Sequence, residues 1–192
     1  MMTKRCEWCE NTFEQYVRYH DEEWGVPVRD DKKQFEFLVL ESAQAGLSWS
    51  TILKKREGYR KAFANFDVQK VARFDEERVQ KLLENPEIVR NELKIRSAIN
   101  NAQQFIKIQE AFGSFSDYIW SFVDGEPVQN EWNQLSEIPA TTELSDKLSK
   151  DLKNRGFKFL GSTTVYAHMQ ATGLVNDHTV DCFRYEEIKN MT

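Results

Sequence analysis

The stretch Asn85–Gly113, NPEIVRNELKIRSAINNAQQFIKIQEAFG, decides the fold. It opens with a helix break at Asn85-Pro86, because proline lacks an amide hydrogen and disfavours helix in the residue before it. Apolar side chains then recur at three- and four-residue steps, the period of an α-helix, at Ile95, Ala98, Ile99, Ala102, Phe105 and Ile106. The stretch therefore predicts a turn and a long amphipathic helix that ends near Gly113.

Helical spacing also recurs on both sides of this stretch. Asp75 can begin a helix that carries Val79, Leu82 and Leu83, so the turn joins two helices. Further helices are expected at 31–45, where Asp30-Asp31 can form the cap, and at 48–63, where Ser48 begins the helix, and also at 143–155 and 162–172. Asp67 opens a short turn through Val71, and residues 114–123 form a short, aromatic-rich segment. Residues 124–142 are expected to form a loop, and the tail from Leu174 is expected to be short and polar. The fold class predicted is all-α, in one compact unit.

Composition and charge narrow the class of protein. The chain has 192 residues, enough for one domain, and 26 basic against 31 acidic residues give a net charge of −5. A whole-surface polyanion binder is excluded, but a local basic face for DNA is not. The start MMTKRCEW lacks the apolar core of a signal peptide, and Phe37–Leu40 is far too short to span a membrane. With three cysteines, this indicates a reducing, cytoplasmic setting and no membrane partner.

Possible metal ligands lie at the two ends of the chain. Cys6, Cys9 and His20 are near the start, and His178 and Cys182 are near the end. Two thiolates and two imidazoles would satisfy the tetrahedral coordination of structural zinc. Spacing also allows a set in which Cys9 replaces His20, and it allows three ordinary reduced cysteines with two surface histidines.

Glu41 stands in an apolar context. Its helical neighbours include Phe37, Leu38 and Ala45. An ionised carboxylate buried without a partner is costly, so such groups are usually paired, neutralised or functional. The alternative, which the residues alone favour, is a carboxylate that reaches the surface or caps a neighbouring backbone.

Aromatic residues crowd the first quarter of the chain, at Trp8, Tyr16, Tyr19, Trp24 and Trp49. Such rings can form a platform on which bases stack, although core packing is the commoner role.

Basic residues follow the helix break, at Arg90, Lys94 and Arg96, where helix-start amides can hold a phosphate. A helical hairpin without a ligand is commoner. The run Lys54-Lys55-Arg56 is expected to lie on a solvated face.

Several blocks in register resemble the 3-methyladenine DNA glycosylase I family, over nearly the whole chain. They are Arg5–Trp8, Tyr19–Pro27, Leu40–Trp49, Leu53–Glu57, Trp120–Val123, Leu148–Lys153, Arg155–Phe159 and Gly173–His178. The resemblance implies a helix-hairpin-helix DNA glycosylase fold with a small zinc-bound lobe that joins the N- and C-termini. It implies one domain over 1–192, with the core at about 30–140 and the lobe formed by about 1–29 and 141–192.

The resemblance also assigns site residues. Structural zinc, one ion per chain, falls on Cys6, His20, His178 and Cys182, which leaves Cys9 as a spare thiol. The flipped base is expected between the rings of Tyr19 and Trp49, with Glu41 accepting from its amino edge and Trp24 supporting the wall. The DNA wedge falls on Gln44, Gly46 and Leu47, and the DNA-backbone contacts fall on Ile88, Arg90 and Asn91. Glu87 and Glu92 depart from the family pattern and add negative charge near the DNA.

The implied function is that of a monofunctional DNA glycosylase, which hydrolyses the N-glycosidic bond of 3-methyladenine in alkylated double-stranded DNA as the first step of base excision repair. Free 3-methyladenine is the product. Glu41 is the catalytic residue, through electrostatic support of an oxocarbenium-like transition state. Glu110 and Asp117 are weaker candidates for a catalytic aspartate equivalent. A monomer that works in the cytoplasm of a bacterial-type cell, on nucleoid DNA, is expected.

Two other classes of function stay open on sequence alone. One is a zinc-stapled DNA-binding module that senses damage without cutting. The other is a helical protein-interaction domain whose aromatic residues are all core. Release of free base from methylated DNA separates the enzyme from both.

Overall fold

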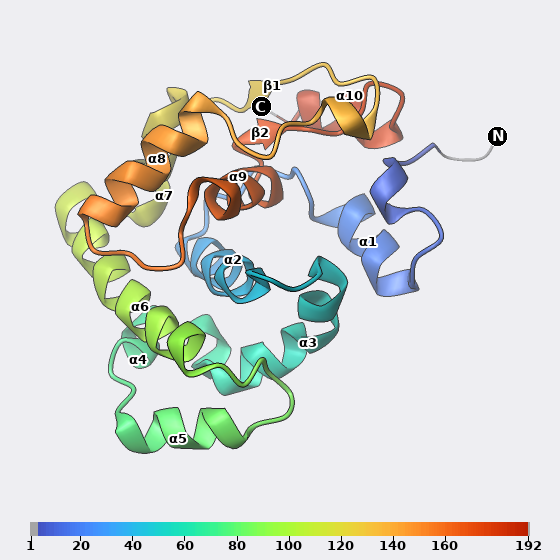
Figure 1. Cartoon of the computed structure of the whole chain (residues 1–192). Helices are drawn as coiled ribbons and strands as arrows, with labels where there is room; N and C mark the ends of the chain where they lie inside the picture. The colour runs from blue at the N-terminus through green and yellow to red at the C-terminus, as the bar shows by residue number, and fades with distance from the viewer. Residues whose placement is uncertain (1–3, 192) are drawn as a thin grey trace.

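The computed structural model describes residues 4–191 and has ten α-helices in that range (Figure 1). Residues Met1–Thr3 and Thr192 lie outside the described residues. The first three belong to the N-terminal stretch in which no signal peptide is expected. The helices are α1 (Glu14–Glu22), α2 (Asp31–Gln44), α3 (Trp49–Ala62), α4 (Val68–Val71), α5 (Glu76–Glu84), α6 (Glu92–Phe112), α7 (Phe115–Trp120), α8 (Glu143–Asn154), α9 (Ser162–Ala171) and α10 (Phe183–Lys189). Single 3-10 turns are η1 (Glu7–Cys9), η2 (Ala64–Phe66), η3 (Ser121–Val123) and η4 (Leu135–Glu137). The predicted all-α fold class is confirmed.

Helix α2 is the centre of the molecule. Residues 34–43 are all buried, and the helix contacts α3, α6, α7 and α9 (Figure 1). The helix begins as predicted, because the side chain of Asp30 accepts a hydrogen bond from the backbone amide of Lys33 at 2.8 Å. Along residues 4–191, no helix combines the length and the apolar content that crossing a membrane requires.

The predicted helical hairpin is present between α5 and α6. Asp75 and Asn91 cap the two helices, and Gly113 ends α6. Helix α3 packs against the turn: the amide of Val89 donates to the hydroxyl of Tyr59 at 3.2 Å, and Nζ of Lys55 donates to the carbonyl of Pro86 at 2.7 Å. The hairpin is therefore held against the rest of the fold by side chains of α3.

The tail from Leu174 differs from the expected polar segment. Residues 174–179 are buried, and β2 (Val175–Asn176) pairs in parallel with β1 (Val128–Gln129), which lies inside the expected loop. Helix α10 follows, with Tyr185 and Ile188 buried. Two-residue strands and a seven-residue helix are too short to leave a periodic signal, and their burial comes from partners distant in sequence.

A glycine contact between α3 and the hairpin gives a test of this packing. A Cβ at Gly58 would lie 2.3 Å from the carbonyl oxygen of Glu87. Alanine is favoured over glycine inside a helix by about 1 kcal/mol, yet we expect Gly58→Ala to lower the free energy of unfolding by about 2 kcal/mol or more. Urea denaturation measures the change. Gly161→Ala is the control, because φ there is −66° and no atom lies within 4 Å; equal stabilities for both variants would contradict the contact.

Candidate functional site

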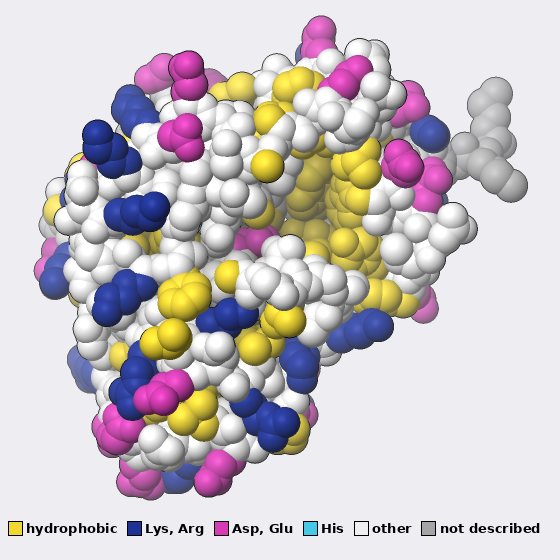
Figure 2. All heavy atoms as spheres, in the orientation of Figure 1, with side chains coloured by type: hydrophobic (Ala, Val, Ile, Leu, Met, Phe, Trp, Pro, Cys, Tyr) yellow, Lys and Arg dark blue, Asp and Glu magenta, His cyan; other side chains and the backbone are white. Residues whose placement is uncertain are grey.

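A cavity of about 210 Å³ lies between the N-terminal segment, α2, α3 and α9. Its walls are mostly aromatic and apolar, and Figure 2 shows its mouth as a hollow lined by hydrophobic side chains. The lining residues are Trp8, Tyr16, Tyr19, Trp24, Glu41, Gln44, Trp49, Leu135, Ile138, Ala167 and Gln170. All five residues of the aromatic crowd are therefore part of one cavity.

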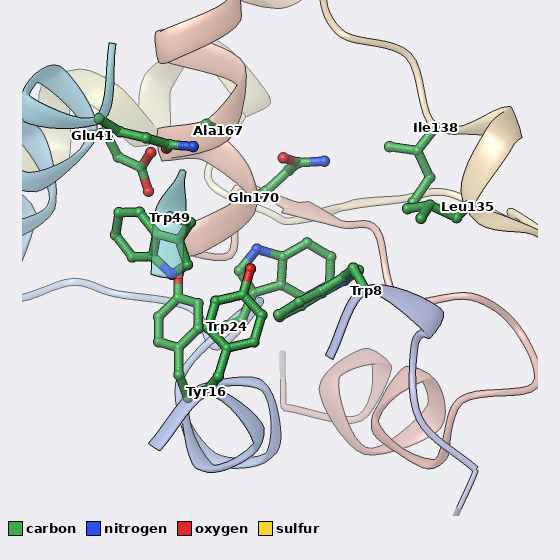
Figure 3. A pocket seen from close by; sticks show the side chains of 11 residues that line it. Trp8, Tyr16, Trp24, Glu41, Trp49, Leu135, Ile138, Ala167 and Gln170 are labelled. Atoms are coloured by element: carbon green, nitrogen blue, oxygen red, sulfur yellow. The ribbon is translucent and has the colours of Figure 1, made fainter. Parts of the chain in front are cut away.

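Glu41 supplies the only carboxylate among these lining residues. Its side chain projects from α2 toward Trp49 and the cavity (Figure 3), is 4% exposed, and has no hydrogen-bond or ion-pair partner among residues 4–191. Burial raises the pKa of this carboxyl to about 8. Glu110 and Asp117, the weaker carboxylate candidates, are exposed and do not line the cavity.

The arrangement of the rings differs from the expected sandwich. Tyr19 and Trp49 contact one another, with ring centroids 5.3 Å apart and planes at 45°. A base between two rings needs planes about 7 Å apart, twice the stacking distance in a duplex. As they stand, the two rings form one wall, and the cavity also borders Trp8 and Tyr16 (Figure 3). Trp8 and Tyr16 belong to the aromatic residues of the first quarter of the chain, but nothing in the sequence assigned them to the base-binding site.

An ion-pair network behind the cavity holds its three helices together. The guanidinium of Arg56 on α3 makes two 2.8 Å bonds to the carboxylate of Glu23, at the end of α1, and one of 2.8 Å to Glu36 on α2. Burial would raise the pKa of Glu23, but the hydrogen bonds and charge of Arg56 lower it to about 2. These helices carry Tyr19, Glu41 and Trp49, so the network fixes their relative positions. Arg56 is buried, and the expected solvated face is wrong for this residue.

The turn between α2 and α3 lies at the edge of the cavity. Gln44 lines the cavity, whereas Gly46 and Leu47 are exposed. Gly46 has φ of +76°, and the amide of Leu47 donates to the carbonyl of Gln44 at 2.6 Å. The three residues expected to form a wedge therefore share one tight turn beside the cavity.

The hairpin residues expected to contact DNA are in three different environments. Ile88 is buried, the side chain of Asn91 caps α6, and Arg90 is exposed with no partner among the described residues. Of the other two basic residues, Lys94 donates to backbone carbonyls and Arg96 pairs with Glu76 and Glu92. Arg90 is thus the basic side chain of this group that faces solvent unpaired.

A buried cluster of Cys6, His20, His178 and Cys182 joins the two ends of the chain. Their potential ligand atoms lie within 4.8 Å of one another, and Cys9 is outside the set. Nδ1 of His178 lies 3.4 Å from Sγ of Cys6 and 3.6 Å from Sγ of Cys182. A tetrahedron with metal–ligand distances of about 2.0–2.3 Å has edges of about 3.3–3.8 Å, and these two separations lie in that range, so the cluster could hold a metal ion.

The second ring nitrogen of each histidine has its own acceptor. Nδ1 of His20 donates to Asp21 at 2.8 Å, and Nε2 of His178 donates to the carbonyl of Trp24 at 3.0 Å. Asp21 is held in turn by Arg5. Such outer contacts fix the orientation and tautomer of metal-binding histidines. They also connect the cluster to Trp24 in the cavity wall.

Comparison with known proteins gives a consistent result. The profile of the family described as methyladenine glycosylase matches residues 8–185. The chain belongs to this family. DNA-3-methyladenine glycosylase 1 of Escherichia coli is 50% identical over 95% of this chain and 97% of its own length, and DNA-3-methyladenine glycosylase of Haemophilus influenzae is 46% identical over 94% and 97%.

Solved structures of methyladenine glycosylases superpose closely. A crystal structure of 3-methyladenine DNA glycosylase I has a TM-score of 0.91 at 49% identity, covering 94% of this chain and 98% of its own. A tyrosine-to-phenylalanine variant of 3-methyladenine DNA glycosylase I, in complex with 3-methyladenine, has a TM-score of 0.90 at 41% identity, covering 93% and 96%.

The pKa of Glu41 predicts how stability depends on pH. The folded value is about 8 and the ordinary value is 4.5, so between them the folded chain holds more protons than the unfolded chain. As far as this group is concerned, the free energy of unfolding is highest below the ordinary pKa. It falls as pH rises toward about 8, with a slope of at most about 1.4 kcal/mol per pH unit. Glu41→Gln should therefore gain unfolding free energy relative to the native protein as pH rises from about 5 to about 8. Denaturant titrations measure this gap, and exposed Glu110→Gln is the control. A gap that does not grow with pH would contradict the burial of an unpaired carboxyl.

Proposed function

We propose that this chain is a monofunctional DNA glycosylase that flips 3-methyladenine out of alkylated double-stranded DNA and hydrolyses its N-glycosidic bond, the first step of base excision repair. The observation that carries the proposal is the buried carboxylate of Glu41, which lies in an aromatic cavity and has no partner in the described part of the chain. Family membership supports it, as do relatives whose names give this activity and a similar structure that holds 3-methyladenine.

The substrate explains the character of the cavity. Methylation at N3 gives adenine in DNA a positive charge, and an ionised Glu41 would attract that charge where neutral bases gain less. The approach of a cation lowers the pKa of a buried carboxyl, so a group with a pKa of about 8 in the free protein loses its proton as the base enters. The aromatic walls would cover the faces of the flipped base, with Tyr19, Trp49 and Trp24 as base-binding residues and Tyr16 and Trp8 added to them.

The chemical step needs little proton transfer to the base. The bond between C1′ and the base breaks with its electron pair going to the cationic ring, which leaves as neutral 3-methyladenine. Water adds to C1′ and releases one proton, and an abasic site remains. Glu41 stabilises the positive charge that develops on the sugar, in a cavity where water screens it poorly.

DNA contacts are assigned to the exposed elements beside the cavity. We assign the wedge to Leu47 with Gln44 and Gly46, since Leu47 is 41% exposed at the cavity edge. At the hairpin, we assign the contacts with the DNA phosphate backbone to Arg90 and to the segment between Ile88 and Asn91 at the start of α6. Glu87 and Glu92 are exposed there and weaken the attraction.

The metal proposed for the buried cluster is zinc, one ion per chain, held by Cys6, His20, His178 and Cys182. Two cysteines and two histidines form a closed set with no open position, so the ion is structural. It stabilises a lobe formed by about 1–29 and 141–192 beside a core at about 30–140, within one glycosylase domain. We expect the chain to act as a monomer in the cytoplasm of a bacterial-type cell, on nucleoid DNA; the relatives from Escherichia coli and Haemophilus influenzae support this setting.

Glu41→Gln tests the proposal directly. It should lower the single-turnover release of 3-methyladenine from methylated duplex DNA by a factor on the order of 10²–10³, because the charge that stabilises the transition state is lost. Chromatography of the free base measures the rate. Glu110→Gln makes the same chemical change on the surface and should act like the native protein. Native protein that binds methylated duplex but releases no base would instead support a damage-sensing module.

His178→Ala tests the metal assignment. We expect it to lose bound zinc and to lower the thermal midpoint by roughly 10 °C, because one ligand of a closed site is missing. Atomic absorption and calorimetry measure the two effects. Cys9→Ser is the control and should retain zinc, because Sγ of Cys9 donates to the carbonyl of Cys6 at 3.2 Å outside the ligand set. Stoichiometric zinc in His178→Ala would show that the assigned ligand set is wrong.

A further inference from the structure

The turn at the cavity edge has a defined geometry. Ala45 has φ −45° and ψ 117°, and Gly46 has φ +76°. With the hydrogen bond from the amide of Leu47 to the carbonyl of Gln44, these angles define a type II turn. A type I turn of the same four residues differs mainly in the orientation of the Ala45–Gly46 peptide, which would be rotated by about half a turn.

Lys94 contacts the peptide by which the two turn types differ. From the first turns of α6, its ammonium donates to the carbonyl of Ala45 at 2.6 Å and to that of Ala43, near the end of α2, at 2.8 Å. It thus stabilises the C-terminus of α2 and holds the Ala45 carbonyl in its type II orientation. No acidic side chain pairs with Lys94 within residues 4–191.

Lys94 also joins two elements that meet DNA in the proposed function. It lies three residues after Asn91, the cap of the hairpin's second helix, and its side chain reaches the turn that carries Leu47. The side chain of Lys94 therefore links the turn directly to the second helix of the hairpin.

We propose, given the glycosylase activity inferred above, that Lys94 is a positioning residue that holds the 44–47 turn in the type II form required to insert Leu47 into duplex DNA. It does not touch the base or the phosphate in this role. A turn free to change its central peptide would present Leu47 in more than one orientation, and each insertion would require the turn to be ordered first.

The experiment compares two substrates in one assay. Lys94→Met removes the ammonium and keeps the apolar stem. We expect single-turnover release of 3-methyladenine from duplex DNA to fall by about tenfold or more, since hydrogen bonds from a charged donor are stronger than those between neutral groups. Release from single-stranded DNA should change by less than about twofold, because no duplex stack has to be opened. Affinity for free 3-methyladenine, measured by quenching of the cavity tryptophans, should be unchanged.

Three further single variants and one double variant test the mechanism. Lys94→Arg keeps the charge and donors and should regain most of the duplex rate. A Cβ at Gly46 would meet no atom within 4 Å, but Gly46→Ala disfavours φ of +76°, so it should lower the rate on duplex DNA selectively, as Lys94→Met does. Because both changes act on the same turn, the double variant should lose less than the product of the two single losses. Lys107→Met removes the same charge from the same helix, where Nζ donates to the side chain of Gln104, and should leave both rates unchanged.

If native protein releases 3-methyladenine, three results would overturn the proposal for Lys94. They are an unchanged duplex rate in Lys94→Met, equal losses on both substrates, and a salt dependence of duplex binding reduced by about one ion, which is the sign of a lost phosphate contact. Native protein that releases no base from either substrate would contradict the glycosylase proposal instead.

Discussion

The burial of one unpaired carboxylate is the constraint on which the rest of the site depends. Glu41 has no cationic partner among residues 4–191, so the fold holds this group at the expense of stability. The surrounding structure makes that possible. Arg56 joins α3 to α2 and to the end of α1. Helix α2, which carries Glu41, packs against four other helices. A cationic ligand is the partner that the carboxylate lacks, which connects the energetics of the fold to the choice of substrate.

The two ends of the chain support the same cavity from the other side. The Cys/His cluster brings the segment that carries Trp8 together with the buried tail, and His178 contacts the backbone of Trp24 directly. A metal at this position would act at a distance from the chemistry, through the aromatic wall. Loss of the metal is therefore expected to affect stability and the shape of the cavity together.

Local features of the sequence predicted the helices well, and long-range features explain what was missed. Asp30, Ser48 and Asp75 each begin a helix as expected, because capping is decided within four residues. The burial of Arg56 was not predictable within the run Lys54-Lys55-Arg56, since its partner Glu23 lies 33 residues away. The contact between the rings of Tyr19 and Trp49, which leaves no gap between them, likewise depends on how α1 packs against α3. The resemblance named the site residues, but it did not give the distances among them.

The joining of the termini has a consequence for synthesis on the ribosome. Cys6 and His178 are 172 residues apart in sequence, yet their side chains meet in one cluster. Contacts this distant form late, after the entropy of closing nearly the whole chain has been overcome. The start of the N-terminal segment, at Cys6, therefore gains its contacts in the cluster only after residues 178–182 have been translated, whereas the end of α1 is already held to α3 through Glu23 and Arg56. A nascent chain that has not yet reached His178 is expected to lack this support behind Trp24, so full capacity to remove bases is expected only once the Cys/His cluster has formed.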